Sequence, residues 1–394
     1  TAKIADLVVI QDNSVADGAM ANTLRMRVTD AFGNTLGGQT VSVTADNSAM
    51  VASTVITGPD GTVEISVTSQ TAGISIVTAS INNSSLSRDV TFVADVRTAQ
   101  IADLVVIKDG SEADGLTANT LQVRVTDAFG NALAGQTVSV LADNGATVAP
   151  TVTTQPDGTV EISVTSQTAG VSAVTATINS SSQSQNVTFI ADVRTAKIAD
   201  LVVIKDGSEA DGSTANTLRA RVTDAFGNAL AGQTVSVLGG NGATVSPTVI
   251  TGPDGTVEIS VTSQTAGTST VTASINSSSL SRNVTFVADV RTAQIAVLEV
   301  TQDYAVADGS TANTLRARVT DAFGNALAGQ AVSVMAGNSA TVTPTVTTQS
   351  DGTVEFSVTS QTAGTSTVTA SINSSSLSRD VTFIADVRTA QIAV

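Results

Sequence analysis

Carboxylates are the side chains whose type and spacing could support chemistry in this chain. Acidic residues recur at intervals of 97 in four successive copies. The recurring acidic positions, numbered in the first copy, are Asp12, Asp17, Asp30, Asp60, Glu64 and Asp95. Asp95 stands just before the second copy, in which Asp103 and Asp109 follow. Because calcium binds oxygen ligands, carboxylates from both sides of this joint could share one ion and stiffen it.

The alternative explanation for these acidic residues is structural. Asp17-Gly18 and Asp60-Gly61 are ordinary turn pairs. No EF-hand loop or repeated glycine–aspartate motif occurs, and Val297 stands where the fourth copy would repeat Asp103. We favour the structural explanation and expect no cofactor. An unchanged melting temperature in EDTA would argue against calcium.

The chain lacks the residues that most enzymes use for acid–base and nucleophilic steps. It contains no histidine and no cysteine, which removes the commonest general base and the thiol nucleophile. Chemistry that pairs serine with lysine would need a lysine, and the fourth copy, 292–388, contains none. We therefore expect no enzymatic activity.

The formal net charge of −16 limits the possible partners. No basic stripe could neutralise the phosphates of a nucleic acid, and an acidic membrane surface would repel the chain. No run of 18 apolar residues exists, so the sequence predicts no membrane insertion. Evenly spread negative charge favours a soluble monomer.

The repeat period predicts an array of four domains, because a unit of 97 residues can bury its own core. The predicted bounds are 1–97, 98–194, 195–291 and 292–388, with the start of a further repeat at 389–394. Since the chain starts and stops at equivalent points of the repeat, we expect it to be a segment of a longer protein.

Each copy is rich in Val, Thr and Ser, which favours strands. In the second copy, Leu121, Val123 and Val125 alternate with polar residues, as in a strand with one buried face. Seven strands are predicted there, over 101–107, 121–125, 136–141, 151–154, 160–164, 171–178 and 186–193. About seven short strands in about 100 residues indicate an all-β, immunoglobulin-like β-sandwich. Phe189 is expected to be its largest core side chain.

The joints between copies are short. The last predicted strand passes through Ala94 to Ala99 straight into the next copy, without a glycine, proline or serine run. An arginine lies at each joint, and Arg97 could pair with an acidic loop of the neighbouring domain and fix its tilt. A solvated charge worth less than about 1 kcal/mol is the alternative that we favour. We expect the tandem domains to form an elongated, semi-rigid rod about 140–160 Å long.

Two sequence motifs recur in every copy. In the second copy they are Val-Thr-Asp-Ala-Phe-Gly-Asn-Ala-Leu-Ala-Gly, Val125 to Gly135, and Asp-Gly-Thr-Val-Glu-Ile-Ser-Val-Thr-Ser-Gln-Thr-Ala-Gly, Asp157 to Gly170. With Val-Thr-Ala at Val174 to Ala176, this pattern resembles the bacterial Ig-like (group 1) repeats of the intimin/invasin family of outer-membrane adhesins. One departure is Ala132, where the family often has proline.

The resemblance implies a non-catalytic extracellular stalk at the bacterial cell surface. The outer-membrane anchor, and the distal domain that would bind a host-cell receptor or another surface, would lie outside this chain. The alternative is that the repeats themselves bind a host ligand, or copies on neighbouring cells in a biofilm. Exposed edge strands would be the expected mode of such weak, multivalent binding. The near-identity of the copies favours the stalk, because a receptor site usually appears once.

Overall fold

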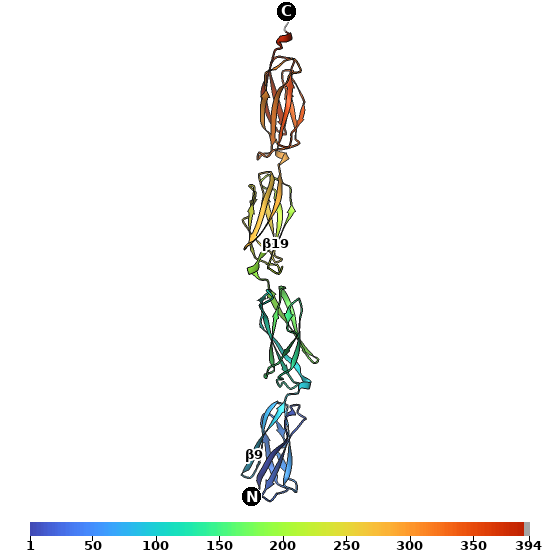
Figure 1. The fold of residues 1–394 in the computed structure, drawn as a ribbon, viewed down its shortest axis with the longest axis vertical. Coiled ribbons are helices and arrows are strands. Elements are labelled where there is room, and N and C mark those ends of the chain that lie inside the picture. The colour runs from blue at the N-terminus through green and yellow to red at the C-terminus, as the bar shows by residue number, and fades with distance from the viewer. Residues whose placement is uncertain (390–394) are drawn as a thin grey trace, which may run out of the picture. The chain divides into compact units, whose positions relative to one another are not determined.

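Each repeat folds into two sheets that enclose one core (Figure 1). The computed structural model describes residues 1–389. In the second repeat, one sheet has four strands in the order β10-β12-β16-β14, and the other has five in the order β11-β18-β17-β13-β15. All pairs are antiparallel except β11 with β18. Among the described residues, no strand pairs with a strand of another repeat, and the other three repeats have the same two strand orders.

The chain divides into two compact units, 1–192 and 193–394, and each unit holds two sandwiches. The first repeat contains β1 Lys3–Gln11, β2 Ser14–Val15, β3 Asn22–Thr29, β4 Thr40–Ala45, β5 Met50–Val51, β6 Thr54–Ile56, β7 Thr62–Thr68, β8 Gly73–Ile81, β9 Ser84–Val93 and the 3-10 turn η1 Val96–Thr98. The second contains β10 Gln100–Lys108, β11 Ser111–Glu112, β12 Asn119–Thr126, β13 Thr137–Ala142, β14 Thr147–Val148, β15 Thr151–Thr153, β16 Thr159–Thr165, β17 Gly170–Ile178 and β18 Ser181–Ile190.

The second unit repeats the same series of elements. It begins with η2 Val193–Thr195, β19 Lys197–Lys205, β20 Ser208–Glu209, β21 Asn216–Thr223, β22 Thr234–Gly239, β23 Thr244–Val245, β24 Thr248–Ile250, β25 Thr256–Thr262, β26 Gly267–Ile275 and β27 Ser278–Val287. It continues with η3 Val290–Thr292, β28 Gln294–Gln302, β29 Ala305–Val306, β30 Asn313–Thr320, β31 Ala331–Ala336, β32 Thr341–Val342, β33 Thr345–Thr347, β34 Thr353–Thr359, β35 Gly364–Ile372, β36 Ser375–Ile384 and η4 Val387–Thr389. Beyond Thr389, the predicted start of a further repeat lies outside the described residues.

The predicted all-β sandwich is confirmed, and each of the seven strands predicted in the second copy has a counterpart. Two further strands, β11 and β14, have only two residues each and carry no periodic pattern that sequence alone could show. The last strand was predicted too late, over 186–193, whereas β18 spans Ser181–Ile190. Its first half is a serine- and glutamine-rich run that pairs with β17 across a tight turn at Asn179, whose φ is 50°.

The core of each sandwich is aliphatic and holds one phenylalanine on the last long strand. Phe189 is 1% exposed, and Phe92, Phe286 and Phe383 are its equivalents, as predicted. Facing strands contribute alternating buried residues, for example Val123 and Val125 from one sheet and Val138 and Val140 from the other. The alternation that predicted the strands is therefore the pattern that fills the core.

A buried asparagine fixes the start of the five-stranded sheet. The side-chain oxygen of Asn119, which is fully buried, accepts the backbone N–H of Ser111 at 2.9 Å. Its amide nitrogen donates to the carbonyl of Thr188 at 2.9 Å. The asparagine therefore satisfies backbone groups that the short parallel pair β11–β18 leaves open, which gives a structural reason for its recurrence as Asn22, Asn216 and Asn313.

Candidate functional site

The junction between the first and second repeats is a capped turn rather than the continuous strand that the sequence predicted. Strand β9 ends at Val93, η1 follows, and β10 begins at Gln100. The carboxylate of Asp95 accepts the backbone N–H of Arg97 at 3.0 Å and its guanidinium Nε at 2.9 Å. The Thr98 hydroxyl donates to the carbonyl of Asp95 at 3.1 Å. Capping by these side chains favours a tight turn over an extended chain.

Hydrogen bonds donated by Arg97 favour the ionised form of Asp95. The guanidinium of Arg97 is the main cause that lowers the pKa of Asp95 below its usual value, and partial burial opposes it. Asp289 and Arg291 form the same arrangement in the second unit, with the same direction of shift in the pKa of Asp289. The capped turn is therefore a repeated element of the junction sequence.

The turn forms a hydrogen bond to a fully buried carboxylate of the following repeat. Asp127 is 0% exposed, and its Oδ2 accepts the backbone N–H of Asp95 at 3.1 Å. Within its own loop it accepts three more donors, the N–H of Phe129 at 2.9 Å and the N–H and side-chain amide of Asn131 at 2.9 and 2.8 Å. Four donors satisfy a charge that would otherwise be costly to bury.

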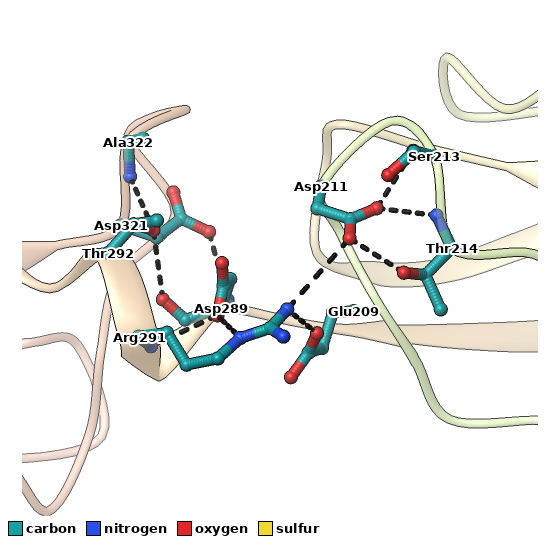
Figure 2. A network of polar contacts seen from close by, with 9 residues as sticks. All are labelled: Glu209, Asp211, Ser213, Thr214, Asp289, Arg291, Thr292, Asp321 and Ala322. Carbon is teal, nitrogen blue, oxygen red and sulfur yellow. Dashed lines mark hydrogen bonds and ion pairs between the residues drawn. The ribbon is translucent and has the colours of Figure 1, made fainter.

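The same contact joins the third and fourth repeats. Asp321 is also 0% exposed and accepts the backbone N–H of Asp289 at 3.2 Å. Figure 2 shows the two residues side by side, with the Thr292 hydroxyl bonded both to Asp289 and to the backbone N–H of Ala322. The junction thus links the turn to the first loop of the next repeat at two points.

An asparagine completes the junction by crossing from one repeat to the other. Asn131 donates its side-chain amide to the carbonyl of Gln70 at 2.9 Å and accepts the backbone N–H of Ala72 at 2.8 Å. Asn325 makes the same two bonds to Gln264 and Ala266. Such a paired donor and acceptor fixes both the distance and the direction of approach of the two loops.

The first repeat shows the same loop without a described repeat before it. Asp30 keeps the three bonds within its loop, from Phe32 and Asn34. Phe32 is 92% exposed, whereas Phe129 and Phe323 are each 46% exposed. The preceding repeat therefore covers about half of this ring as well as burying the aspartate, which adds apolar contact to the polar junction.

The sequence-based hypothesis that Arg97 pairs with the neighbouring domain is wrong. Arg97 pairs with Asp95 of its own repeat at 2.9 Å, and its side chain is 69% exposed. Arg291 pairs with Asp289 at 3.0 Å and with Glu209, and it lies 4.0 Å from Asp211 (Figure 2). Each of these partners belongs to the same repeat as its arginine. The arginine therefore stabilises the turn and forms no ion pair with the following repeat.

The structure does not bring together the three aspartates proposed for calcium. The carboxylate of Asp95 is occupied by Arg97, and Asp103 projects from the exposed side of β10. Asp109 accepts the backbone N–H of Thr188 at 2.6 Å within the second repeat. Over residues 1–389, no three acidic side chains gather in a group that could hold a metal ion. Calcium binding to this chain stays an untested hypothesis.

Turn formation explains the recurrence of other acidic residues. Asp114 accepts the backbone N–H of Thr117 at 2.6 Å, the hydroxyl of Thr117 at 2.7 Å and the backbone N–H of Leu116 at 2.8 Å. These bonds, of which the Thr117 N–H contributes most, lower the pKa of Asp114 to about 2. Asp308 has an equivalent set and its pKa is likewise lowered to about 2.

These lowered pKa values predict acid sensitivity. Because the folded pKa of Asp114 lies below its ordinary value of 3.8, its stabilisation is present above pH 3.8 and is lost as the pH falls towards 2. We expect the melting temperature, followed by circular dichroism, to be constant above about pH 5 and to fall below about pH 4. The variant with Asp114→Asn and Asp308→Asn should show a smaller fall. A melting temperature that stays constant down to about pH 2 would contradict the prediction.

Comparison with known proteins decides the family. The model of the bacterial Ig-like domain (group 1) matches residues 4–93, 101–190, 198–287 and 295–384. The chain belongs to the bacterial Ig-like (group 1) family. The resemblance predicted from the recurring motifs is thereby confirmed, and each match lies within one sandwich.

Known relatives of this Ig-like chain include adhesins. It is 32% identical over 427 residues to the inverse autotransporter adhesin YeeJ of Escherichia coli K12, an alignment that covers 100% of this chain and 18% of the relative. The crystal structure of invasin, a bacterial integrin-binding protein, matches 97% of this chain and 79% of its own, at 24% identity and a TM-score of 0.44. The Escherichia coli adhesin FdeC matches 74% of this chain and 100% of its own, at 20% identity and a TM-score of 0.47.

The matched family is that of a bacterial Ig-like domain and the relative YeeJ is an adhesin, and neither is an enzyme. Within the described residues, no helix has the length and apolar character needed to cross a bilayer. The features that stand out in this Ig-like array are the junctions. Asn131 belongs to one of the two recurring motifs, but nothing in that motif indicates partners 59 and 61 residues earlier in the chain.

Proposed function

We propose that this chain is a repeat segment of a bacterial surface adhesin and that it acts as a spacer. In this role the Ig-like repeats hold a binding domain, located elsewhere in the protein, away from the cell surface. The similarity to an adhesin supports the assignment, although the chain spans only 18% of that relative's length. A host receptor or another surface would be bound outside this segment, and an anchor in the outer membrane would also lie outside it.

The observation that carries the spacer role is the construction of the junction. A spacer holds a distant domain in place only if its joints resist bending. Joints made of flexible linkers would not resist bending. At the junction of the first and second repeats, Asn131 bonds to Gln70 and Ala72 while buried Asp127 bonds to Asp95. Each hydrogen bond of this kind makes a net contribution to stability of about 0.5–1.5 kcal/mol, and a larger one where a charged group takes part. We further propose that the junctions need no metal ion for their stiffness.

Removing the asparagines that cross the junctions should make the array more flexible. We expect the variant with Asn131→Ala and Asn325→Ala to show a broader distribution of end-to-end distances, because each junction loses two bonds between repeats. Small-angle scattering of the whole chain, with spin labels placed in the first and second repeats, would measure the change. The unaltered chain should have a maximum dimension of about 140–160 Å.

Asn34→Ala is the matched control for this experiment. Asn34 makes the same bonds within its own loop, to Asp30, but contacts no other described repeat. It should therefore leave the distance distribution unchanged. The spacer proposal fails if the unaltered chain has a maximum dimension near about 80 Å, or if the junction variant matches the control.

A further inference from the structure

The segments at which the chain enters and leaves a sandwich run side by side. In the second repeat, β10 begins beside the start of β18, because the backbone N–H of Ile101 donates to the hydroxyl of Ser181 at 3.0 Å. At the other end of β18, Ser111 pairs with Phe189, and the strands β11 and β18 are parallel there. The entering segment, 101–113, and the leaving strand β18 therefore run in the same direction along the repeat.

Further hydrogen bonds join the two segments where β18 ends. The side chain of Asp109 accepts the backbone N–H of Thr188 at 2.6 Å. The carbonyl of Thr188 accepts the side-chain amide of Asn119 at 2.9 Å, and the oxygen of that asparagine holds the start of β11. The backbone N–H of Ala113 donates to the carbonyl of Ile190 at 2.7 Å. We call these bonds, together with the β11–β18 pair, the clamp.

The clamp recurs in the other three repeats. The bond from an aspartate to the last long strand measures 2.6, 2.6 and 2.7 Å there. The aspartates are Asp12, Asp206 and Asp303, and their partners are Thr91, Thr285 and Thr382. The carbonyl of each of these threonines also accepts an asparagine amide, at 2.8, 2.9 and 3.1 Å. The clamp therefore gives this recurring aspartate a structural role in every repeat.

Tension along the chain would load the clamp in shear. A pull on the start of the repeat draws 101–113 one way, and a pull on its end draws β18 the opposite way. The pairs β10–β12 and β17–β18 are antiparallel, and the bonds of such pairs are perpendicular to the strands. Sliding therefore strains all of these bonds together with the clamp. Strands pulled apart from one end would instead lose their bonds one after another.

We propose that this chain bears tension and that the clamp in each repeat is the element that resists it. The proposal goes beyond the spacer role. A spacer needs joints that resist bending, whereas a load-bearing chain needs sandwiches that stay folded while they are pulled. Resistance of this kind is set by the rate of unfolding under force rather than by the free energy of unfolding at rest. It also depends on the direction of the pull.

Stretching of the whole chain at constant force in magnetic tweezers tests the proposal. The chain contains no cysteine, so cysteines introduced at its two termini attach it at those points alone. We expect four separate lengthening steps, one for each sandwich, each of about 300 Å at full extension. Asp109→Ala removes one bond of the clamp in the second repeat. It should raise the unfolding rate of one of the steps at least about tenfold at the same force.

Asp143→Ala is the matched control in the same repeat. The carboxylate of Asp143 also accepts a backbone N–H at 2.6 Å, that of Ala173, but this bond joins β17 to the turn after β13 and lies outside the clamp. Gly240 and Gly337 occupy the position in the third and fourth repeats, so the sandwich tolerates the loss. Both variants should lower the melting temperature of the second repeat similarly. Asp143→Ala should change the unfolding rate under tension by less than about twofold, because its bond is still intact when the clamp breaks.

A second pulling direction separates load bearing from ordinary stability. Gln100 and Ser180 lie near the same end of the sandwich, where Asn179 donates to the carbonyl of Ala99 at 3.0 Å. Handles at Gln100→Cys and Ser180→Cys should peel β10 away and unfold the repeat at a lower force than pulling at the termini.

Two results would overturn the proposal. One is an equal unfolding rate in both pulling directions at the same force. The other is that Asp109→Ala speeds unfolding under tension no more than Asp143→Ala does. Neither result affects the distance measurements on the unloaded chain, so load bearing and the spacer role can fail separately.

Discussion

Replacing Phe189 by alanine is expected to unfold the second repeat well before the others. The ring is 1% exposed and is one of the largest side chains in the core. Phenylalanine-to-alanine changes in cores cost about 3–5 kcal/mol through lost burial and the remaining cavity. A domain of this size is stable by only about 5–15 kcal/mol. Scanning calorimetry should therefore show one new transition at lower temperature, with the transitions of the remaining repeats little changed.

The control for this prediction is Ile190→Ala, one residue further along β18. Ile190 is 50% exposed, so its replacement should cost less than about 1 kcal/mol. If Phe189→Ala instead lowered all transitions together, the repeats would unfold as one cooperative block and the separate-core description would be wrong. Limited proteolysis would locate the unfolded repeat, because cleavage should concentrate between residues 98 and 192.

Replacing Asp127 by alanine is expected to damage both the second repeat and its junction. The change leaves four donors without an acceptor, three in the loop and the backbone N–H of Asp95. A buried donor that loses its partner costs about 1–3 kcal/mol. Since the loop can relax, the losses do not simply add, and we expect about 3–5 kcal/mol in total. Chemical denaturation followed by calorimetry would measure this loss.

Asp30→Ala supplies the comparison that isolates the junction. Asp30 has the same three donors within its loop but no bond to another of the described repeats, and it is only partly buried. Its replacement should cost less than that of Asp127, and the difference measures what the junction adds. Equal losses for the two variants would mean that the junction bond contributes nothing. Only Asp127→Ala should also broaden the distance between labels in repeats one and two.

Much of the fold could be predicted from the sequence because its signals are local. Leu121, Val123 and Val125 alternate with polar residues, and all three are buried as the pattern requires. The start of the last strand, β18, was misplaced because the local sequence gives no signal there. The run from Ser181 to Gln185 is polar on both faces, so its sequence carries no alternation, and the strand there forms because β17 is available to pair with it.

The candidate site was less predictable. The sequence drew attention to Arg97 and to carboxylates at the joints, yet the guanidinium turns back to Asp95 and the proposed calcium ligands stay apart. The residue that crosses the junction, Asn131, is a common turn residue with an ordinary local role. Asn34 stands in the same Asp-Ala-Phe-Gly-Asn run, yet no described repeat precedes it and it bonds only within its own loop.

The sequence by itself determined the number of repeats, their all-β sandwich form and the identity of their core, because strand periodicity and repeat length act within about 100 residues. Tertiary structure decided how one repeat meets the next. Asp127 becomes a fully buried junction residue only when the turn at Asp95 is folded against it. This contact joins residues that are distant in the chain, and such proximity is produced by folding rather than by any local pattern.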